Sequence, residues 1–193
     1  MHVNVRHKLG KNLNIIYPGE YYVTGKDELI GTLLGSCVSV VLHDPVNKIG
    51  GMNHFMLPGK ISKNDIFSDD NARYGISAIN QIVSEVVKKG ASRKHLTAKI
   101  FGGGNIIKFL NMSGKKSLIP SDNVRVARLF MEIEDIPIVA SDVGDNYTRK
   151  IIFDVDSGKV YLRKIQGGIV NEILSLRDED ELIHNIETKA GKK

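Results

Sequence analysis

The sequence predicts an α/β or α+β domain built around a mixed sheet. Short β-branched runs come early in the chain, two amphipathic helical segments follow, and apolar runs at both ends flank turn residues. At 193 residues the chain is long enough for one well-packed domain and short for two. Its hydrophobic content of 41% and charged content of 25% are ordinary for a globular protein.

The first third of the chain reads as an arm followed by strands. Residues 1–17 are polar and basic with little periodicity, which predicts a flexible N-terminal arm. Short β-branched or apolar runs predict strands at 21–24, 28–34, 37–43 and 49–56. The segment Asp44-Pro45-Val46-Asn47-Lys48 carries turn residues at the right offsets, so the last two of these strands are expected to form a hairpin.

The rest of the chain supplies two helices and more strands. After a polar loop at 59–72, apolar residues recur at helical spacing over 73–89, where Asp70 or Asn71 can cap the start and Gly90 suits the end. A second helix is predicted over 121–135, before Pro137. Strands are expected at 97–101 and 138–140, and as a hairpin of 151–153 with 160–162 around Asp156-Ser157-Gly158; a short polar helix is plausible from Ile173.

Composition limits the classes of function. The single cysteine excludes an internal disulfide and fits a reducing compartment. The N-terminus lacks the apolar core of a signal peptide, and no apolar stretch approaches the roughly 20 residues that span a bilayer. We therefore expect a soluble cytoplasmic protein without membrane insertion. The net charge is +5, but no Lys/Arg run exceeds two and aromatics are 6%, so an acidic protein partner is favoured over nucleic acid.

The lone cysteine, Cys37, is the first candidate for chemistry. It follows Gly35 and Ser36, and His54 stands 17 positions further on. A cysteine flanked by valines is most often a small buried hydrophobe. It becomes a nucleophile when a neighbouring base takes the thiol proton. The nucleophile interpretation requires that the fold bring His54 beside Cys37, and the buried-hydrophobe interpretation does not.

The predicted hairpin allows that meeting. If His43 lies opposite Gly50, cross-strand partners sum to 93, so His54 faces Ser39 and Cys37 lies two residues along on the same face. Diagonal neighbours of this kind have backbones about 7–8 Å apart, within reach of a histidine ring and a thiol. A one-residue slip in register would send the two side chains to opposite faces.

Two glycine segments and the histidines need separate interpretations. The turn at Gly35 and Ser36 either aims backbone N–H groups at an oxyanion or simply connects two strands tightly. The run 102–104 lacks phosphate-loop spacing, which favours close backbone packing or a loop beside a site. His43 and His54 flank one hairpin, but no third metal ligand is evident, so neither a metal nor an organic cofactor is expected. The turn-rich segment 142–146 is a loop that could also close over a substrate.

Beyond these patterns, longer strings resemble a known family, the chemoreceptor glutamine deamidases called CheD. The strings are PGEYYV (18–23), TLLGSCVSV (32–40), DP (44–45), GGMNHFMLP (50–58) and KIFGGG (99–104). The resemblance continues through 142–144, Arg149, 158–160 and 163–164, and so covers about 18–168. It implies a deamidase domain over 18–168, between the arm at 1–17 and a charged C-terminal tail at 169–193.

The resemblance implies a three-layer α/β/α sandwich with a mixed sheet, similar to bacterial deamidating toxins. It implies that Cys37 is the nucleophile and His54 its base. Attack by the thiolate on a glutamine amide would then form an oxyanion near the turn at Gly35 and Ser36, the oxyanion or substrate-binding position that the turn suggests. The implied substrates are glutamine side chains on the cytoplasmic helices of chemoreceptors, converted to glutamate in chemotactic adaptation. Some relatives also hydrolyse receptor methyl esters, and in some bacteria the family binds the phosphatase CheC.

Three positions depart from the family pattern. Some relatives have a catalytic threonine six residues before the cysteine, where this chain has Gly31; Thr32, five before, takes that role if the strand carries a bulge. The family's Asp-Thr-Gly-Gly loop reads Asp-Val-Gly-Asp at 142–145, and its Ile-Gly-x-Arg-Asn element reads Ile-Pro-Ser-Asp-Asn at 119–123. With Cys37 and His54 both present, the resemblance predicts a Cys/His glutamine deamidase. The alternative is a non-catalytic binding module that regulates a chemotaxis phosphatase or receptor.

Overall fold

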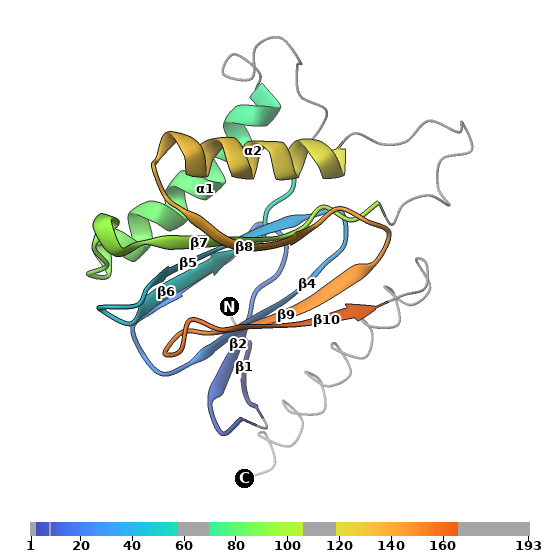
Figure 1. Cartoon of the computed structure of the whole chain (residues 1–193). Coiled ribbons are helices and arrows are strands. Elements are labelled where there is room, and N and C mark those ends of the chain that lie inside the picture. The colour runs from blue at the N-terminus through green and yellow to red at the C-terminus, as the bar shows by residue number, and fades with distance from the viewer. Residues whose placement is uncertain (1–2, 8, 58–69, 106–118, 166–193) are drawn as a thin grey trace.

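The described part of the chain forms two five-stranded sheets packed face to face, with two helices on the outer face of one sheet (Figure 1). The computed structural model describes residues 3–7, 9–57, 70–105 and 119–165. Among these residues no helix is long and apolar enough to cross a membrane.

Sheet A has the strand order β1-β2-β4-β9-β10 and pairs antiparallel except between β2 and β4. Its strands are β1 (Val3–Arg6), β2 (Asn12–Ile15), β4 (Leu29–Leu34), β9 (Thr148–Asp154) and β10 (Val160–Ile165). The predicted hairpin around Asp156-Ser157-Gly158 is confirmed as β9–β10, in which Val160 lies opposite Phe153.

Sheet B has the order β3-β6-β5-β7-β8 and is also mixed, because β7 and β8 run parallel. Its strands are β3 (Tyr21–Thr24), β6 (Ile49–Asn53), β5 (Val38–Asp44), β7 (Thr97–Gly102) and β8 (Ile138–Val143). A short 3₁₀ turn, η1 (Arg93–His95), leads into β7.

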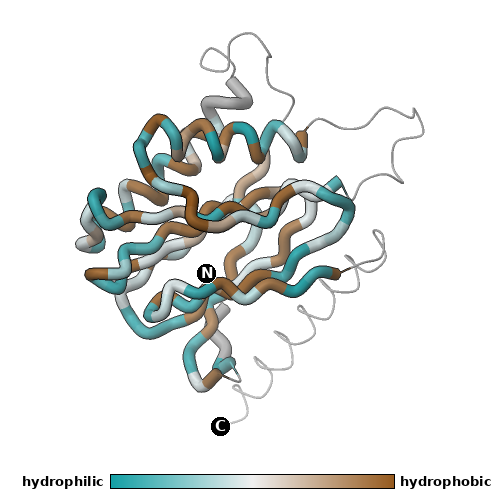
Figure 2. The backbone as a smooth tube through the Cα atoms, viewed as in Figure 1, coloured by the Kyte–Doolittle hydropathy of each residue, from teal (hydrophilic) through white to brown (hydrophobic). Residues whose placement is uncertain are grey.

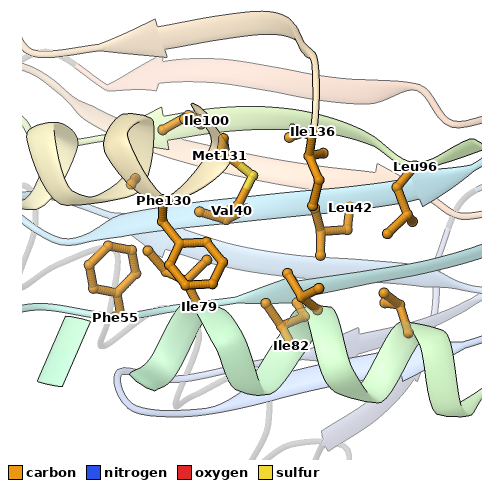
Figure 3. Close-up of a cluster of buried hydrophobic side chains, with 14 of the residues drawn as sticks. Val40, Leu42, Phe55, Ile79, Ile82, Leu96, Ile100, Phe130, Met131 and Ile136 are labelled. Carbon is orange, nitrogen blue, oxygen red and sulfur yellow. The ribbon is translucent and has the colours of Figure 1, made fainter. Parts of the chain in front are cut away.

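The helices α1 (Asp70–Lys88) and α2 (Ile119–Ile133) cover sheet B through a continuous apolar core (Figure 3). Alternation along the central strand β5 aims Val40 and Leu42 at the helices, where they meet Ile79 and Ile82 of α1 and Met131 of α2. Both helices fall within three residues of the sequence-predicted boundaries.

The opposite face of sheet B packs on sheet A. Val41 of β5 and Met52 of β6 join Ile30 and Leu34 of β4 and Phe153 of β9 in a second apolar cluster. Every residue of β5 is therefore buried, since both of its faces are covered. Figure 2 shows the resulting alternation of hydrophobic and hydrophilic residues along strands and helices.

The α/β class and the mixed sheets agree with the sequence-based prediction, but the order of the layers differs. The described residues stack as helices, sheet B, sheet A, whereas an α/β/α sandwich places helices on both sides of one sheet. The physical reason is that β4 and β9 bury their apolar side chains against sheet B and so form a second sheet instead of extending the first.

Part of the segment expected to be a flexible arm, residues 1–17, instead forms strands. Residues 1–17 contain β1 and β2, which pair with each other, and β2 continues sheet A alongside β4. Leu13 and Ile16 are buried, which accounts for the order of this segment. The tail at 169–193 lies outside the described residues, as does most of the polar loop predicted at 59–72.

Candidate active site

The candidate site lies where the chain crosses from one sheet to the other. Strand β4 of sheet A ends at Leu34 and β5 of sheet B begins at Val38, so the segment 35–37 makes the crossing. Gly35 and Ser36 are buried, and Cys37 is partly exposed and packs beside the apolar cluster between the sheets. The side chain at position 37 is therefore open to solvent on one side and packs against apolar residues on the other.

The hairpin register predicted from the turn residues is confirmed. His43 lies opposite Gly50 and Val41 opposite Met52, and the same register continues to an isolated bridge between Val38 and Phe55. Both backbone hydrogen bonds of that bridge are 2.9 Å long. Between the two stretches the side chain of Asn53 replaces the ladder, because its Oδ1 accepts the Val40 N–H at 2.8 Å.

This register puts Cys37 and His54 on the same face of sheet B. Side chains at alternate positions of β5 share a face, so Cys37 and Ser39 point as Val41 does, toward sheet A. His54 also points toward sheet A, since its ring meets Thr32 of β4. The thiol and the imidazole are thus diagonal neighbours between the sheets, as the sequence analysis expected.

Thr32 orients the His54 ring. The Thr32 hydroxyl donates its one hydrogen to the carbonyl of Ile16 at 2.7 Å, and the same Oγ1 lies 2.8 Å from His54 Nδ1. An oxygen whose hydrogen is already given away can only accept, so Nδ1 carries the proton of the neutral ring. Nε2 then holds the lone pair, which is the form of a general base.

Thr32 reaches His54 without the expected bulge. Strand β4 pairs with β9 in one unbroken register from Leu29 to Leu34. Ile30, Thr32 and Leu34 therefore share the face toward sheet B, while Gly31 faces away, where a Cβ would meet Leu13 and Ile152. Strand parity thus favours position 32 over 31 for a side chain that contacts the histidine.

The surroundings of His54 keep it neutral. Its side chain is 3% exposed, and burial lowers its pKa from 6.5 to about 4. Among the described residues its Nε2 has no hydrogen-bond partner, although the atom is buried. A buried ring nitrogen with a lone pair and no donor beside it is available to take a proton from a thiol.

The glycine run 102–104 at the end of β7 holds the segment 35–37, which carries the candidate nucleophile Cys37. Gly104 N–H donates to the Gly35 carbonyl at 2.8 Å, and Gly103 N–H donates to the Cys37 carbonyl at 2.7 Å. Gly102 has a φ of +108°, and a Cβ there would overlap the Cys37 carbonyl oxygen. Of the two interpretations of this run, close backbone packing is confirmed.

Asn123 of α2 is a site residue whose role the sequence analysis missed. Its side chain is fully buried; Nδ2 donates to the Ser36 carbonyl at 2.9 Å, and Oδ1 accepts the Leu57 N–H at 2.7 Å. It therefore joins the segment that carries Cys37 to the one that carries His54. An asparagine near a helix start is typically interpreted as a capping residue. The signal that could have identified it is the family element at 119–123, whose asparagine this chain keeps at position 123.

Arg149 of β9 supports the glycine run from the other side. Its side chain is fully buried, its Nε donates to Asp142 Oδ1 at 2.6 Å, and its Nη1 donates to the Tyr147 carbonyl at 3.1 Å. A Cβ on Gly104 would lie 3.3 Å from Nη1. Asp142, from the turn-rich segment 142–146, is thus tied down by an ion pair beside the site.

The described residues offer no metal centre. They contain no group of three His, Cys, Asp or Glu side chains that could hold an ion. His43, the other histidine of the hairpin, is engaged elsewhere, with its Nε2 2.9 Å from the carbonyl of Val155. The two histidines therefore do not converge on a shared ligand.

Comparison with known proteins gives a consistent result. The model of a protein family described as "CheD chemotactic sensory transduction" matches residues 56–164, a range that begins just after His54. Curated proteins named "Probable chemoreceptor glutamine deamidase CheD" match over more of the chain. The one from Hahella chejuensis is 41% identical over 180 residues, covering 91% of this chain and 82% of its own.

Two further matches are a second curated relative and a solved structure. The "Probable chemoreceptor glutamine deamidase CheD" of Janthinobacterium sp. is 43% identical over 166 residues, covering 86% of this chain and 79% of its own. Among solved structures, the Bacillus licheniformis hypothetical protein YfiH shares 14% identity at a TM-score of 0.40 over 63% of this chain and 49% of that one. That structural likeness is too weak to support an argument.

Proposed function

The chain belongs to the CheD family, and on that basis we propose that it deamidates glutamine side chains of chemoreceptors with Cys37 as nucleophile and His54 as base. The relatives' shared name supplies the substrate class. The geometry at the crossing between the sheets supports the assignment of residues.

The reaction follows from the atoms that the site brings together. His54 Nε2 accepts the thiol proton as Cys37 sulfur bonds to the carbonyl carbon of the glutamine amide. The carbonyl oxygen becomes an oxyanion, which we place at the N–H groups of Ser36 and Cys37. The imidazolium then gives its proton to the amide nitrogen, the C–N bond breaks, and ammonia leaves a thioester.

The second half of the cycle reuses the same base. Neutral His54 takes a proton from a water molecule as the water oxygen attacks the thioester carbonyl. The C–S bond breaks, the proton returns to the sulfur, and glutamate is released. No step requires an electron acceptor or a second substrate besides water.

One observation carries the proposal: the contact of Thr32 with His54. By accepting from Nδ1–H it fixes the tautomer in which Nε2 is basic, and it keeps the ring aimed between the sheets. It also stabilises the imidazolium that forms during the reaction, since a hydrogen bond to a charged donor is stronger than one to a neutral donor. Thr32 is in this account a positioning residue for the base.

The lowered pKa of His54 defines the resting state. Because burial holds that pKa at about 4, the free enzyme keeps a neutral imidazole beside the Cys37 thiol at neutral pH. The thiolate then forms as the substrate is attacked, by transfer of the proton to His54.

The rim of the site suits a long side chain that enters from solvent. Met56 is 45% exposed, and the Ser36 hydroxyl lies 3.9 Å from its sulfur, so the residue stands beside the nucleophile segment. Its apolar surface suits the methylene groups of a glutamine, while the amide reaches the partly exposed Cys37. Binding of a CheC-type phosphatase, which the resemblance implies, stays a prediction.

The test is mass spectrometry of a chemoreceptor cytoplasmic fragment incubated with the protein. Deamidation raises the mass by about 1 Da per glutamine, because an NH₂ group is replaced by OH. We expect the increase with the wild-type chain and none with Cys37→Ala. Equal masses after both incubations would refute the proposal, and a non-catalytic binding module would then be the better description.

A further inference from the structure

We propose that Asn123 is a positioning residue for the oxyanion site, because it sets the orientation of the Ser36–Cys37 peptide. The inference rests on the proposed role of Cys37 as the acyl-accepting nucleophile. It adds a residue from α2, which is far from the catalytic strands in sequence, to the machinery of the reaction.

The contacts of Asn123 use both ends of its amide. Nδ2 donates to the Ser36 carbonyl at 2.9 Å and Oδ1 accepts from the Leu57 N–H at 2.7 Å, with the side chain fully shielded from solvent. Neither hydrogen bond competes with water, so each holds its partner firmly. One side chain thus ties the residue before Cys37 to a residue three positions after His54.

Because the peptide bond is planar, this contact also fixes the orientation of the proposed oxyanion donor, the Cys37 N–H. In a trans peptide the C=O of one residue and the N–H of the next point in opposite directions. With the Ser36 carbonyl held by Asn123, the Cys37 N–H lies on the edge of the peptide that faces away from α2.

Asn123 differs from the other supports of this segment. The carbonyls of Gly35 and Cys37 are both held by backbone N–H groups, those of Gly104 and Gly103. The Ser36 carbonyl, by contrast, is held by a side chain of the described residues, that of Asn123. A substitution at position 123 can therefore release one peptide and leave its neighbours restrained.

The substitution Asn123→Asp removes the hydrogen bond to the Ser36 carbonyl and keeps the one from the Leu57 N–H. The carboxylate keeps an oxygen that accepts from Leu57 N–H, but it has no N–H to donate to the Ser36 carbonyl. Two oxygens then face each other, and the Ser36–Cys37 peptide rotates away. Asn14→Asp is the matched control, since Asn14 is 3% exposed and its Nδ2 also donates to a carbonyl, that of Leu29 at 3.4 Å in sheet A.

The experiment compares two reactions of the same thiol. In acylation by 4-nitrophenyl acetate the Cys37 sulfur bonds to the carbonyl carbon, negative charge develops on the carbonyl oxygen, and nitrophenolate leaves. In alkylation by iodoacetamide the sulfur displaces iodide from a saturated carbon, and no oxyanion forms. The ratio of the two rate constants, each corrected with Cys37→Ala, isolates the oxyanion site from the reactivity of the thiol.

We expect Asn123→Asp to lower the acylation rate about tenfold to a hundredfold, less than the hundredfold to thousandfold that removal of an oxyanion donor costs, because the donor is displaced and not removed. Alkylation stays within about threefold of wild type, and Asn14→Asp leaves the ratio unchanged. Equal loss of both rates, or an unchanged ratio, would overturn the proposal. If urea denaturation shows that Asn123→Asp does not fold, Asn123→Ala is judged by the same ratio.

The two reagents also keep this inference separate from the proposed function. Neither reaction uses a chemoreceptor. A wild-type protein that leaves receptor glutamines unchanged, while its acylation-to-alkylation ratio still depends on Asn123, would refute the substrate assignment and support the positioning role. A protein that deamidates receptors with an Asn123-independent ratio would do the reverse.

Discussion

Replacement of Thr32 by valine is the sharpest perturbation of the site, because the two side chains have nearly the same shape. Valine keeps the packing but removes an acceptor for His54 Nδ1–H and a donor to the Ile16 carbonyl. Both partners are then buried without this hydrogen bond, since Ile16 is 1% exposed and His54 3%. At about 1–3 kcal/mol for each of the two buried groups, the free energy of unfolding should fall by about 2–6 kcal/mol.

The effect on rate follows from the charge that His54 gains. A neutral hydrogen bond contributes about 1 kcal/mol, and one to a charged donor about 1.5–3 kcal/mol. The imidazolium therefore loses about 0.5–2 kcal/mol more than the neutral ring, and kcat should fall about 2- to 30-fold. Loss of the fixed tautomer acts in the same direction, because the proton can then sit on Nε2.

Ammonia release from a receptor fragment measures kcat, urea denaturation measures stability, and nitrogen NMR of the imidazole reports which ring nitrogen is protonated. Thr32→Ser keeps the hydroxyl and should retain at least a third of the wild-type rate, with an Nδ1–H ring. A folded Thr32→Val protein whose rate lies within twofold of wild type would refute the role of this contact.

Three further predictions test the surroundings of the site. The pKa of His54 is about 4 in the folded protein and ordinarily 6.5, so the unfolded chain binds the proton first as the pH falls. The contribution of neutral His54 to the free energy of unfolding is therefore intact above pH 6.5 and falls by about 3 kcal/mol between pH 6.5 and 4. Urea denaturation should show this loss in wild type and less of it in His54→Asn. Gly102→Ala should slow alkylation of Cys37 more than about tenfold, because the added methyl group overlaps the Cys37 carbonyl. The control Gly10→Ala should leave the rate unchanged, because Gly10 also has a positive φ, +76°, but open space around it. Equal alkylation rates for Gly102→Ala and wild type would contradict the packing argument. Ser39→Ala should raise the free energy of unfolding by about 1 kcal/mol, because the buried Ser39 hydroxyl has no partner among the described residues; a decrease in the urea midpoint would show that the hydroxyl is satisfied.

Local patterns in the sequence were sufficient for the part of the site that lies on one hairpin. The turn residues after Asp44 specify the register in which His43 faces Gly50, and that register places Cys37 and His54 on one face. Both residues come from strands that are adjacent in sequence and in space. Short-range chemistry therefore determines their relation.

The remaining members of the site depend on long-range packing. Thr32 reaches His54 only because β4 belongs to a second sheet that lies over the first, and no local pattern distinguishes that arrangement from a single larger sheet. Asn123 reaches the nucleophile segment because α2 crosses sheet B at that point. The strand β2 was likewise unpredictable, since its short polar sequence gains stability from pairing with β4 and not from its own periodicity.

The central claim is that Cys37 forms a thioester with the glutamine carbonyl, and capture of that intermediate tests it most directly. The wild-type protein and a glutamine-containing receptor peptide are mixed, stopped with acid within the first turnover, and weighed intact. The account predicts an adduct on Cys37 whose mass is the sum of protein and peptide less about 17 Da of ammonia, and which is absent in Cys37→Ala. Deamidation of the peptide by Cys37→Ala, or an adduct on another residue, would contradict it.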